Sequence, residues 1–285
     1  MLLVQRKPFW LIPNLLSLDA PLVAVAWLYL FAKTWRVDYL PTAAYISLAL
    51  VVWVIYVTDR LLDSSLRGSS SVKLEARHDF HRKYHRAFRR LAIVAGIAAV
   101  VMIVGNLPVR IYENCTLGVV FVIGFFILSV FSTTGPGEIP YTKNILAGLA
   151  FAFGCAVIPF VYTGFDWWEF ILSHELICFA VLCVLNISAI DLWEHANRSA
   201  DPDIKAFDEL ALTLPLTLLG AASLVFAVQA EELTTRPFFY ATLTGAALLH
   251  ILNRNRARFS MDALRVLADI ALLVPFIVFI VASRS

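Results

Sequence analysis

Charged residues are scarce in this chain, and their scarcity decides its class. Only 15% of its 285 residues are Asp, Glu, Lys or Arg, 60% are hydrophobic, and the mean hydropathy is +0.77. A soluble domain has about a quarter of its residues charged and about half apolar. The composition therefore excludes an ordinary soluble domain. It predicts an all-α polytopic membrane protein, because helices satisfy their own backbone hydrogen bonds inside a bilayer.

Several common functional motifs are also missing. The four cysteines form no CxxC pair and belong to no spaced Cys/His set, so we expect them to be small packing residues. The Gly/Pro-rich stretch 132–140 lacks the GxxxxGK[ST] spacing of a nucleotide-binding loop. Six histidines are too few for a membrane di-iron oxidase or desaturase. A net charge of only +2 gives no sign of nucleic-acid binding, and we expect none.

Long hydrophobic runs fill most of the remaining sequence. A membrane-spanning helix takes roughly 17–25 mainly apolar residues. We expect nine such helices, at residues 14–33, 40–58, 91–109, 115–132, 144–164, 171–190, 210–230, 238–252 and 264–282. No sizeable soluble segment separates them. Residues 1–285 are therefore expected to form a single transmembrane domain of two helical halves, roughly 1–135 and 136–285.

The distribution of Lys and Arg tests this count. With nine spans, the N-terminus and every second loop lie on one side, and that side holds 18 of the 23 basic residues. The other side is left with Lys33, Arg36, Arg110, Arg236 and Arg284. Loops rich in Lys and Arg face the cytoplasm. We therefore expect a protein of the cytoplasmic membrane, in contact with membrane lipids and with its N-terminus in the cytoplasm.

Two short acidic stretches follow the second and the sixth apolar runs. Asp59 and Asp63 lie four residues apart, and Asp191 and Glu194 lie three apart, so each pair shares one helix face. Carboxylates at the rim of a bilayer are costly and often functional, and their oxygens suit Mg²⁺. The pattern predicts two cytoplasmic clusters that hold Mg²⁺ and a diphosphate between them. The alternative is two helix ends that carry solvated charges.

This layout resembles the UbiA superfamily of intramembrane prenyltransferases. Members of that family have nine helices and two Asp-rich motifs, which follow helices 2 and 6 on the cytoplasmic side. The first motif reads roughly N-D-x-x-D-x-x-x-D. Asp59 and Asp63 match its last two acids, whereas Ile55 and Tyr56 stand where the family has Asn and its first Asp.

Further parts of the chain carry the same resemblance. The second family motif reads roughly D-x-x-D-x-x-x-D; here Asp191 matches, Glu194 is a conservative replacement, and Arg198 falls on the third acid. The Tyr-Thr-Lys-Asn stretch at 141–144 is similar to the start of the family's fifth helix. The Arg-Lys-Pro at 6–8 is similar to its usual entry into helix 1.

The resemblance implies a Mg²⁺-dependent transfer of an isoprenoid chain. A prenyl diphosphate would be the donor, and a lipophilic or aromatic molecule the acceptor that captures the allylic cation. The implied catalytic and metal-binding residues are Asp59, Asp63, Asp191 and Glu194. The implied diphosphate-binding residues are Arg60, Lys143 and Arg198.

Two other classes of function stay open. A catalytically silent UbiA-like protein would bind an isoprenoid lipid or a partner, with its acidic clusters too far apart or paired with arginines. A small-molecule transporter would have inverted repeats and broken helices, with binding at the midplane. Asp19 in the first run, and Asp262 and Asp269 on either side of Arg265, would line a polar cavity or an ion path. Otherwise these acids pair with Arg265 and with neighbouring helices.

A histidine-rich segment lies between the second and third spans. His78, His81 and His85 are spaced so that they share one face of a helix. One interpretation is a metal site. The other, which the surrounding Arg and Lys residues favour, is a basic amphipathic helix that lies on anionic lipid headgroups.

Overall fold

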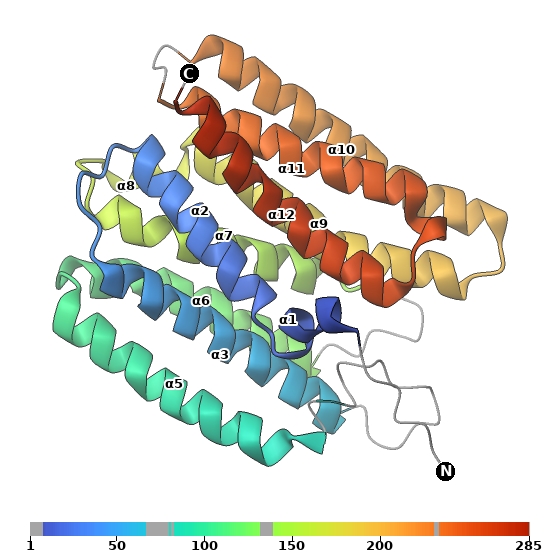
Figure 1. Cartoon of the computed structure of the whole chain (residues 1–285), viewed down its shortest axis with the longest axis horizontal. Helices are drawn as coiled ribbons and strands as arrows, with labels where there is room; N and C mark the ends of the chain where they lie inside the picture. Colours follow the sequence, from blue (N-terminus) through green and yellow to red (C-terminus); the bar gives the residue numbers. More distant parts are fainter. Residues whose placement is uncertain (1–7, 67–79, 81–82, 132–138, 231–233, 285) are drawn as a thin grey trace.

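The computed structural model of the chain describes residues 8–66, 80, 83–131, 139–230 and 234–284, except the side chains of 63–66. All regular elements in these ranges are helices (Figure 1). Nine of them have 16 residues or more. They are α2 (Asp19–Thr34), α3 (Thr42–Leu66), α5 (His85–Asn106), α6 (Arg110–Phe131), α7 (Tyr141–Val161), α9 (His174–Arg198), α10 (Pro202–Gln229), α11 (Arg236–Asn255) and α12 (Met261–Ala282).

Most of these helices are suited to a membrane. Over the described ranges, seven are long and apolar enough to cross a bilayer, and the count is eight if a bent N-terminal pair forms one span. The helix that falls short is α11, whose apolar run is bounded by Arg236 and by the polar Asn253–Asn255 segment. An all-helical membrane fold is therefore confirmed. The full count of nine spans and the side on which the N-terminus lies stay predictions.

The bent pair lies at the N-terminal end of the bundle. A short segment, Phe9–Leu15, meets α2 at 78°. It consists of the single turns η1 (Phe9–Leu11) and α1 (Ile12–Leu15). At the bend Ser17 has a φ of 57°, a left-handed conformation that residues other than glycine seldom adopt. This bent segment lies beside α3, whose Trp53 indole donates a hydrogen bond to the Leu16 carbonyl (Figure 1).

Helices α2 and α9 form the centre of the bundle. Helix α2 packs against α3, α7 and α12, whereas α9 packs against α7, α10, α11 and α12. Helices α5 and α6 lie at the periphery, where α5 packs on α3 and α6 on α7. Their outward faces are apolar, with side chains such as Ile97 and Ile127 exposed, as is expected of surfaces that face lipid.

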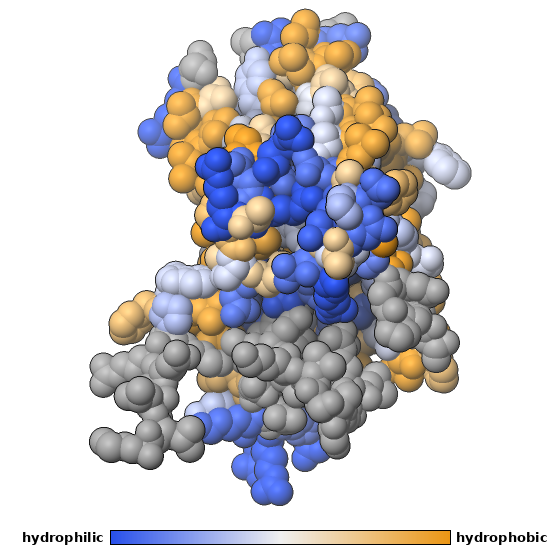
Figure 2. Space-filling view, turned by 90° about the vertical axis from the view of Figure 1, so that its right-hand side faces the viewer, coloured by the Kyte–Doolittle hydropathy of each residue, from blue (hydrophilic) through white to orange (hydrophobic). Residues whose placement is uncertain are grey.

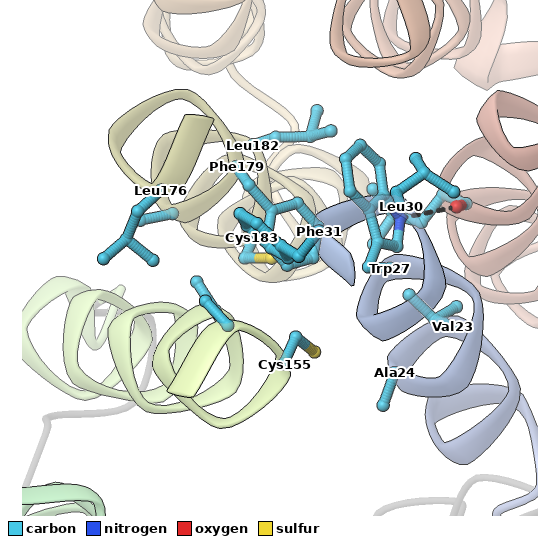
Figure 3. Packing of buried hydrophobic residues seen from close by; sticks show 14 of the residues in the cluster. Val23, Ala24, Trp27, Leu30, Phe31, Cys155, Leu176, Phe179, Leu182 and Cys183 are labelled. Carbon is cyan, nitrogen blue, oxygen red and sulfur yellow. Dashed lines mark hydrogen bonds between the residues drawn. The ribbon is translucent and has the colours of Figure 1, made fainter. Parts of the chain in front are cut away.

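Aromatic packing joins the two central helices (Figure 3). The Trp27 ring of α2 stacks on Phe179 of α9, with 4.0 Å between the ring centroids. The Trp27 indole N–H donates a hydrogen bond of 2.9 Å to the Leu272 carbonyl of α12. Lipid tails are as apolar as these side chains, so close packing and hydrogen bonds, rather than removal from water, hold such helices together. This cluster fixes α2, α9 and α12 relative to one another.

Helices α7 and α9 approach each other closely at Gly148, which has no side chain to keep them apart. A Cβ atom built on Gly148 would lie 2.7 Å from the Val184 backbone nitrogen and 2.8 Å from its Cα. Small residues allow such an approach of two membrane helices. Asn144 lies one turn before Gly148, and Asp191 lies two turns after Val184, on the same two faces. The crossing therefore sets the distance between the polar residues that follow it.

We expect Gly148→Ala to destabilise the bundle by about 1–3 kcal/mol, because the added methyl group meets a backbone that cannot move aside. Gly96→Ala is the matched control, since a Cβ at that position of α5 meets nothing within 4 Å. The control should be neutral or slightly stabilising, because alanine favours a helix over glycine by about 1 kcal/mol. Unfolding of both variants in detergent measures the difference. Equal stability of the two variants would contradict a close α7–α9 crossing.

Candidate functional site

A large cavity lies between α3, α6, α7 and α9. Its volume is about 640 Å³, within the range of roughly 300–1,000 Å³ that is usual for small-molecule sites. Along α7 its lining extends from Lys143 to Ile158, which at 1.5 Å per residue is roughly 22 Å of helix. The cavity is therefore long enough to run through much of the bundle's thickness.

One end of the cavity is charged and the rest is apolar. The charged end lies where α3 and α9 finish, and Figure 2 shows hydrophilic residues gathered over this end of the molecule. Its charged lining residues are Asp19, Asp59, Arg60, Lys143, Asp191, Glu194, Arg265 and Asp269. The opposite part is lined by side chains such as Leu107, Ile111 and Val157. This division suits an amphipathic ligand with a polar head and a long apolar tail.

The two acidic stretches face each other across α7. The Lys143 ammonium group, at the start of α7, lies 3.5 Å from an Asp59 carboxylate oxygen at the end of α3. Its neighbour Asn144 donates a hydrogen bond of 2.8 Å from its amide to the Asp191 carboxylate of α9. Consecutive residues on a helix point about 100° apart, so the first turn of α7 reaches both acids at once. Asp59 and Asp191, separated by 132 residues in the sequence, thereby line one cavity.

Glu194 is held by two arginines. One carboxylate oxygen accepts a hydrogen bond from Arg265 of α12, and the other accepts one of 2.9 Å from Arg198. The side chain of Arg265 is only 3% exposed, whereas that of Arg198 is 65% exposed. Arg265 also lies 3.5 Å from Asp262, the pairing expected for neighbours in the ninth run. Glu194 therefore lies in a salt-bridge cluster at the edge of the cavity.

Arg60 joins α3 to the bent N-terminal segment, Phe9–Leu15 and the residues that follow it. Its buried guanidinium group donates hydrogen bonds to the Asn14 carbonyl and, at 2.8 Å, to the Ser17 hydroxyl. The Asn14 side-chain amide in turn donates a hydrogen bond to the Asp19 carboxylate. The indole N–H of Trp53 on α3 donates one to the Leu16 carbonyl. Arg60 also lines the cavity. These contacts give it a structural role beside the diphosphate-binding role that the resemblance implies.

The structure brings together most of the predicted site residues that it describes. Five of them line the cavity, namely Asp59, Arg60, Lys143, Asp191 and Glu194. Arg198 does not line it and touches the site through Glu194. The side chain of Asp63 lies outside the described part, as do His78 and His81. His85 is the first residue of α5.

Three polar residues of the site were not assigned a role by sequence reasoning. Asn14 lies in the predicted first span, Asn144 appeared only as part of a resembling stretch, and Arg265 was paired only with its neighbours in the ninth run. The partner of Arg265, Glu194, is 71 residues away in the sequence. A polar side chain inside an apolar run is a usable signal of such a site. It does not show which residue such a side chain contacts.

The charged residues of the lining determine whether the cavity could hold a metal ion. Of the described residues, no group of three His, Cys, Asp or Glu side chains is close enough to hold a metal by itself. The cavity lining carries five carboxylates against three cationic side chains, an excess of two negative formal charges. Mg²⁺ usually binds through one or two carboxylates together with substrate phosphates, rather than in an all-protein cage. Asp59 and Asp191 line the cavity and are of the residue type that such a site uses, although each already has a polar neighbour, Lys143 or Asn144. Both oxygens of Glu194 accept hydrogen bonds from arginine.

Comparison with known proteins identifies no relative. No family model, no curated protein and no solved structure matches the chain. The function is therefore argued from the cavity itself. Its decisive property is the meeting of two distant acidic stretches and a lysine at the polar end of an otherwise apolar space.

The two arginines on Glu194 should differ greatly in their contribution to stability. We expect Arg265→Met to cost about 3–5 kcal/mol, because it leaves a mostly buried carboxylate without its buried partner. Arg198→Met should cost less than about 1 kcal/mol, because the Arg198 side chain is 65% exposed and Glu194 keeps its buried partner Arg265. Denaturant unfolding of both variants tests the difference, and adding Glu194→Gln to Arg265→Met should restore most of the loss. Similar effects of the two single substitutions would show that the buried pair does not stabilise this end.

Proposed function

We propose that this protein is an intramembrane prenyltransferase of UbiA-like architecture. It transfers an isoprenoid chain from a prenyl diphosphate to a lipophilic or aromatic acceptor and requires Mg²⁺. The observation that carries the proposal is the single cavity with Asp59, Asp191 and Lys143 at one end and apolar side chains along the rest. The polar end suits a diphosphate with its metal ion, and the apolar part suits an isoprenoid chain.

Electrostatics support a metal requirement. A diphosphate brings several negative charges to a lining that already has two in excess, so its binding without a divalent cation is unfavourable. Asp59 and Asp191 would hold Mg²⁺, which neutralises charge on a departing diphosphate. Lys143, 3.5 Å from Asp59, is close enough to the same place to donate hydrogen bonds to phosphate oxygens.

The apolar part of the cavity supports transfer rather than hydrolysis. An allylic cation formed when the C–O bond breaks reacts with any water nearby, so the site has to exclude water. The rings of Phe125, Phe151 and Phe153 line the cavity, and aromatic faces attract cations. These side chains would enclose the isoprenoid chain while the acceptor attacks its first carbon.

A second candidate is a catalytically silent protein that binds an isoprenoid lipid. The ion pairs favour it, because Glu194 is engaged by two arginines and Asp59 by Lys143. Acids that are neutralised in this way are weaker metal ligands, since metal affinity grows with the charge of the site. The two candidates share the cavity and differ in whether the bound chain is transferred.

Binding of farnesyl diphosphate to the purified protein in detergent tests the metal site. We expect binding to require Mg²⁺ and to weaken by at least about tenfold in Asp59→Asn and in Asp191→Asn, because each substitution removes one charged metal ligand. Asp166→Asn is the matched control. Asp166 caps α8 (Trp167–Ile171) away from the cavity lining, and asparagine caps a helix equally well.

The outcomes separate the candidates. Binding that needs no metal and survives both substitutions, but is lost in Lys143→Met, contradicts the metal site and supports a silent lipid-binding protein. If binding depends on the metal, the next experiment incubates farnesyl diphosphate, labelled in its isoprenoid chain, with the protein in its native membranes. Label that appears in a new lipid product supports the transferase, and label that stays on the diphosphate contradicts it.

A further inference from the structure

The ammonium group of Lys143 has two neighbours of different kinds at the charged end of the cavity. It lies 3.5 Å from an Asp59 carboxylate oxygen of α3 and 5.0 Å from the centre of the Phe125 ring of α6. All three side chains line the cavity, and that of Lys143 is 22% exposed. Lys143 therefore connects the start of α7 to both α3 and α6 beside the space that a ligand can occupy.

The contact with Asp59 restrains the lysine only loosely. Its 3.5 Å exceeds the length of about 2.7–2.9 Å that is usual for a charge-assisted hydrogen bond between an ammonium group and a carboxylate. Lysine also has a flexible four-carbon stem, so a single long contact leaves it free to reorient. A metal ion that binds Asp59 would remove this restraint, because it takes the carboxylate and repels the ammonium group.

The Phe125 ring supplies a restraint that does not depend on the carboxylate. The face of an aromatic ring attracts a cation that lies within about 6 Å of its centre, and Lys143 meets this distance. A ring carries no net charge, so it holds the ammonium group without neutralising it and does not compete for a metal ion. The lysine keeps its charge and its N–H donors for phosphate oxygens.

We propose that Phe125 is a positioning residue, whose ring keeps the Lys143 ammonium group at the charged end of the cavity when a metal ion and a diphosphate bind. This inference rests on the proposed function, because the ligand that Lys143 meets is the diphosphate. It gives Phe125 a task different from that of Phe151, which lines the same cavity but has no Lys or Arg of the described residues over its ring.

The test compares farnesyl diphosphate with farnesol, which has the same chain but no diphosphate. Both are titrated in the presence of Mg²⁺ against the full chain in one detergent. Partitioning into detergent is the same for every variant, so the ratio of the two affinities is compared between variants. Phe125→Leu should lower the preference for the diphosphate by about threefold to thirtyfold, the equivalent of one cation–π contact. Phe125→Tyr keeps the ring and should retain the wild-type preference.

Two controls separate positioning from packing. Phe151→Leu makes the same chemical change in the same cavity and should alter both affinities alike, which leaves their ratio unchanged. In a Lys143→Met background, Phe125→Leu should lower the ratio no further, because no ammonium group is left to position. If Phe125→Leu does not fold, Phe125→Met is titrated in its place. A ratio that survives loss of the ring, or that falls by the same factor in the Lys143→Met background, overturns the inference.

A second measurement needs no ligand. In denaturant unfolding of the ligand-free protein, Phe125→Leu should lower the folding equilibrium constant by about threefold to thirtyfold more in the wild-type background than in Lys143→Met. Absence of this coupling contradicts the contact between the ring and the lysine.

The outcomes distinguish this inference from the proposed function. Wild-type protein that binds farnesyl diphosphate with Mg²⁺, but whose preference does not change in Phe125→Leu, refutes the role of Phe125 and leaves the proposed function intact. Wild-type protein that shows the unfolding coupling but binds no farnesyl diphosphate refutes the prenyltransferase, and with it the role of Phe125 toward a diphosphate, while the contact with Lys143 stands.

Discussion

A carboxylate inside an apolar bundle is costly unless a neighbour offsets its charge or donates a hydrogen bond to it, and this constraint organises the polar end of the protein. Lys143 matches Asp59, Asn144 donates to Asp191, and two arginines hold Glu194. These contacts come from α3, α7, α9 and α12. The same end is therefore where the helices are most strongly joined by polar contacts and where the cavity carries its charge. Stability and the proposed ligand binding would therefore depend on the same side chains.

The backbone makes this matching possible. Gly148 lets α7 approach α9, and the first turn of α7 then places Lys143 and Asn144 beside acids from two different helices. The aromatic cluster around Trp27 and Phe179 fixes the other side of α9. Between these two packed regions the cavity stays open. An empty space of about 640 Å³ costs van der Waals contacts in a closely packed protein. A bound ligand would restore these contacts.

Sequence reasoning singled out residues that line one cavity but did not give the contacts between them. Hydropathy alone identified the apolar runs, and the acidic exits of two of them supplied Asp59 and Asp191, which do line one cavity. The resemblance implies that Glu194 is a metal ligand, which stays a prediction; the structure adds that its two oxygens accept hydrogen bonds from Arg198 and Arg265. The i, i+4 pairing with Arg198 is readable from spacing. The pairing with Arg265 is not, because it depends on how α9 and α12 pack.

The sequence by itself determined that the chain is a helical membrane protein and that carboxylates follow two of its apolar runs. Both are local properties, since a bilayer demands continuous apolar helices and tolerates charge only where it has a role. Only the tertiary structure decided which charges neutralise which, that Arg60 anchors the bent N-terminal segment to α3, and that Lys143 and Asn144 of α7 reach acids on two different helices. These contacts depend on how the helices cross, as at Gly148, and composition and residue spacing do not predict such crossings.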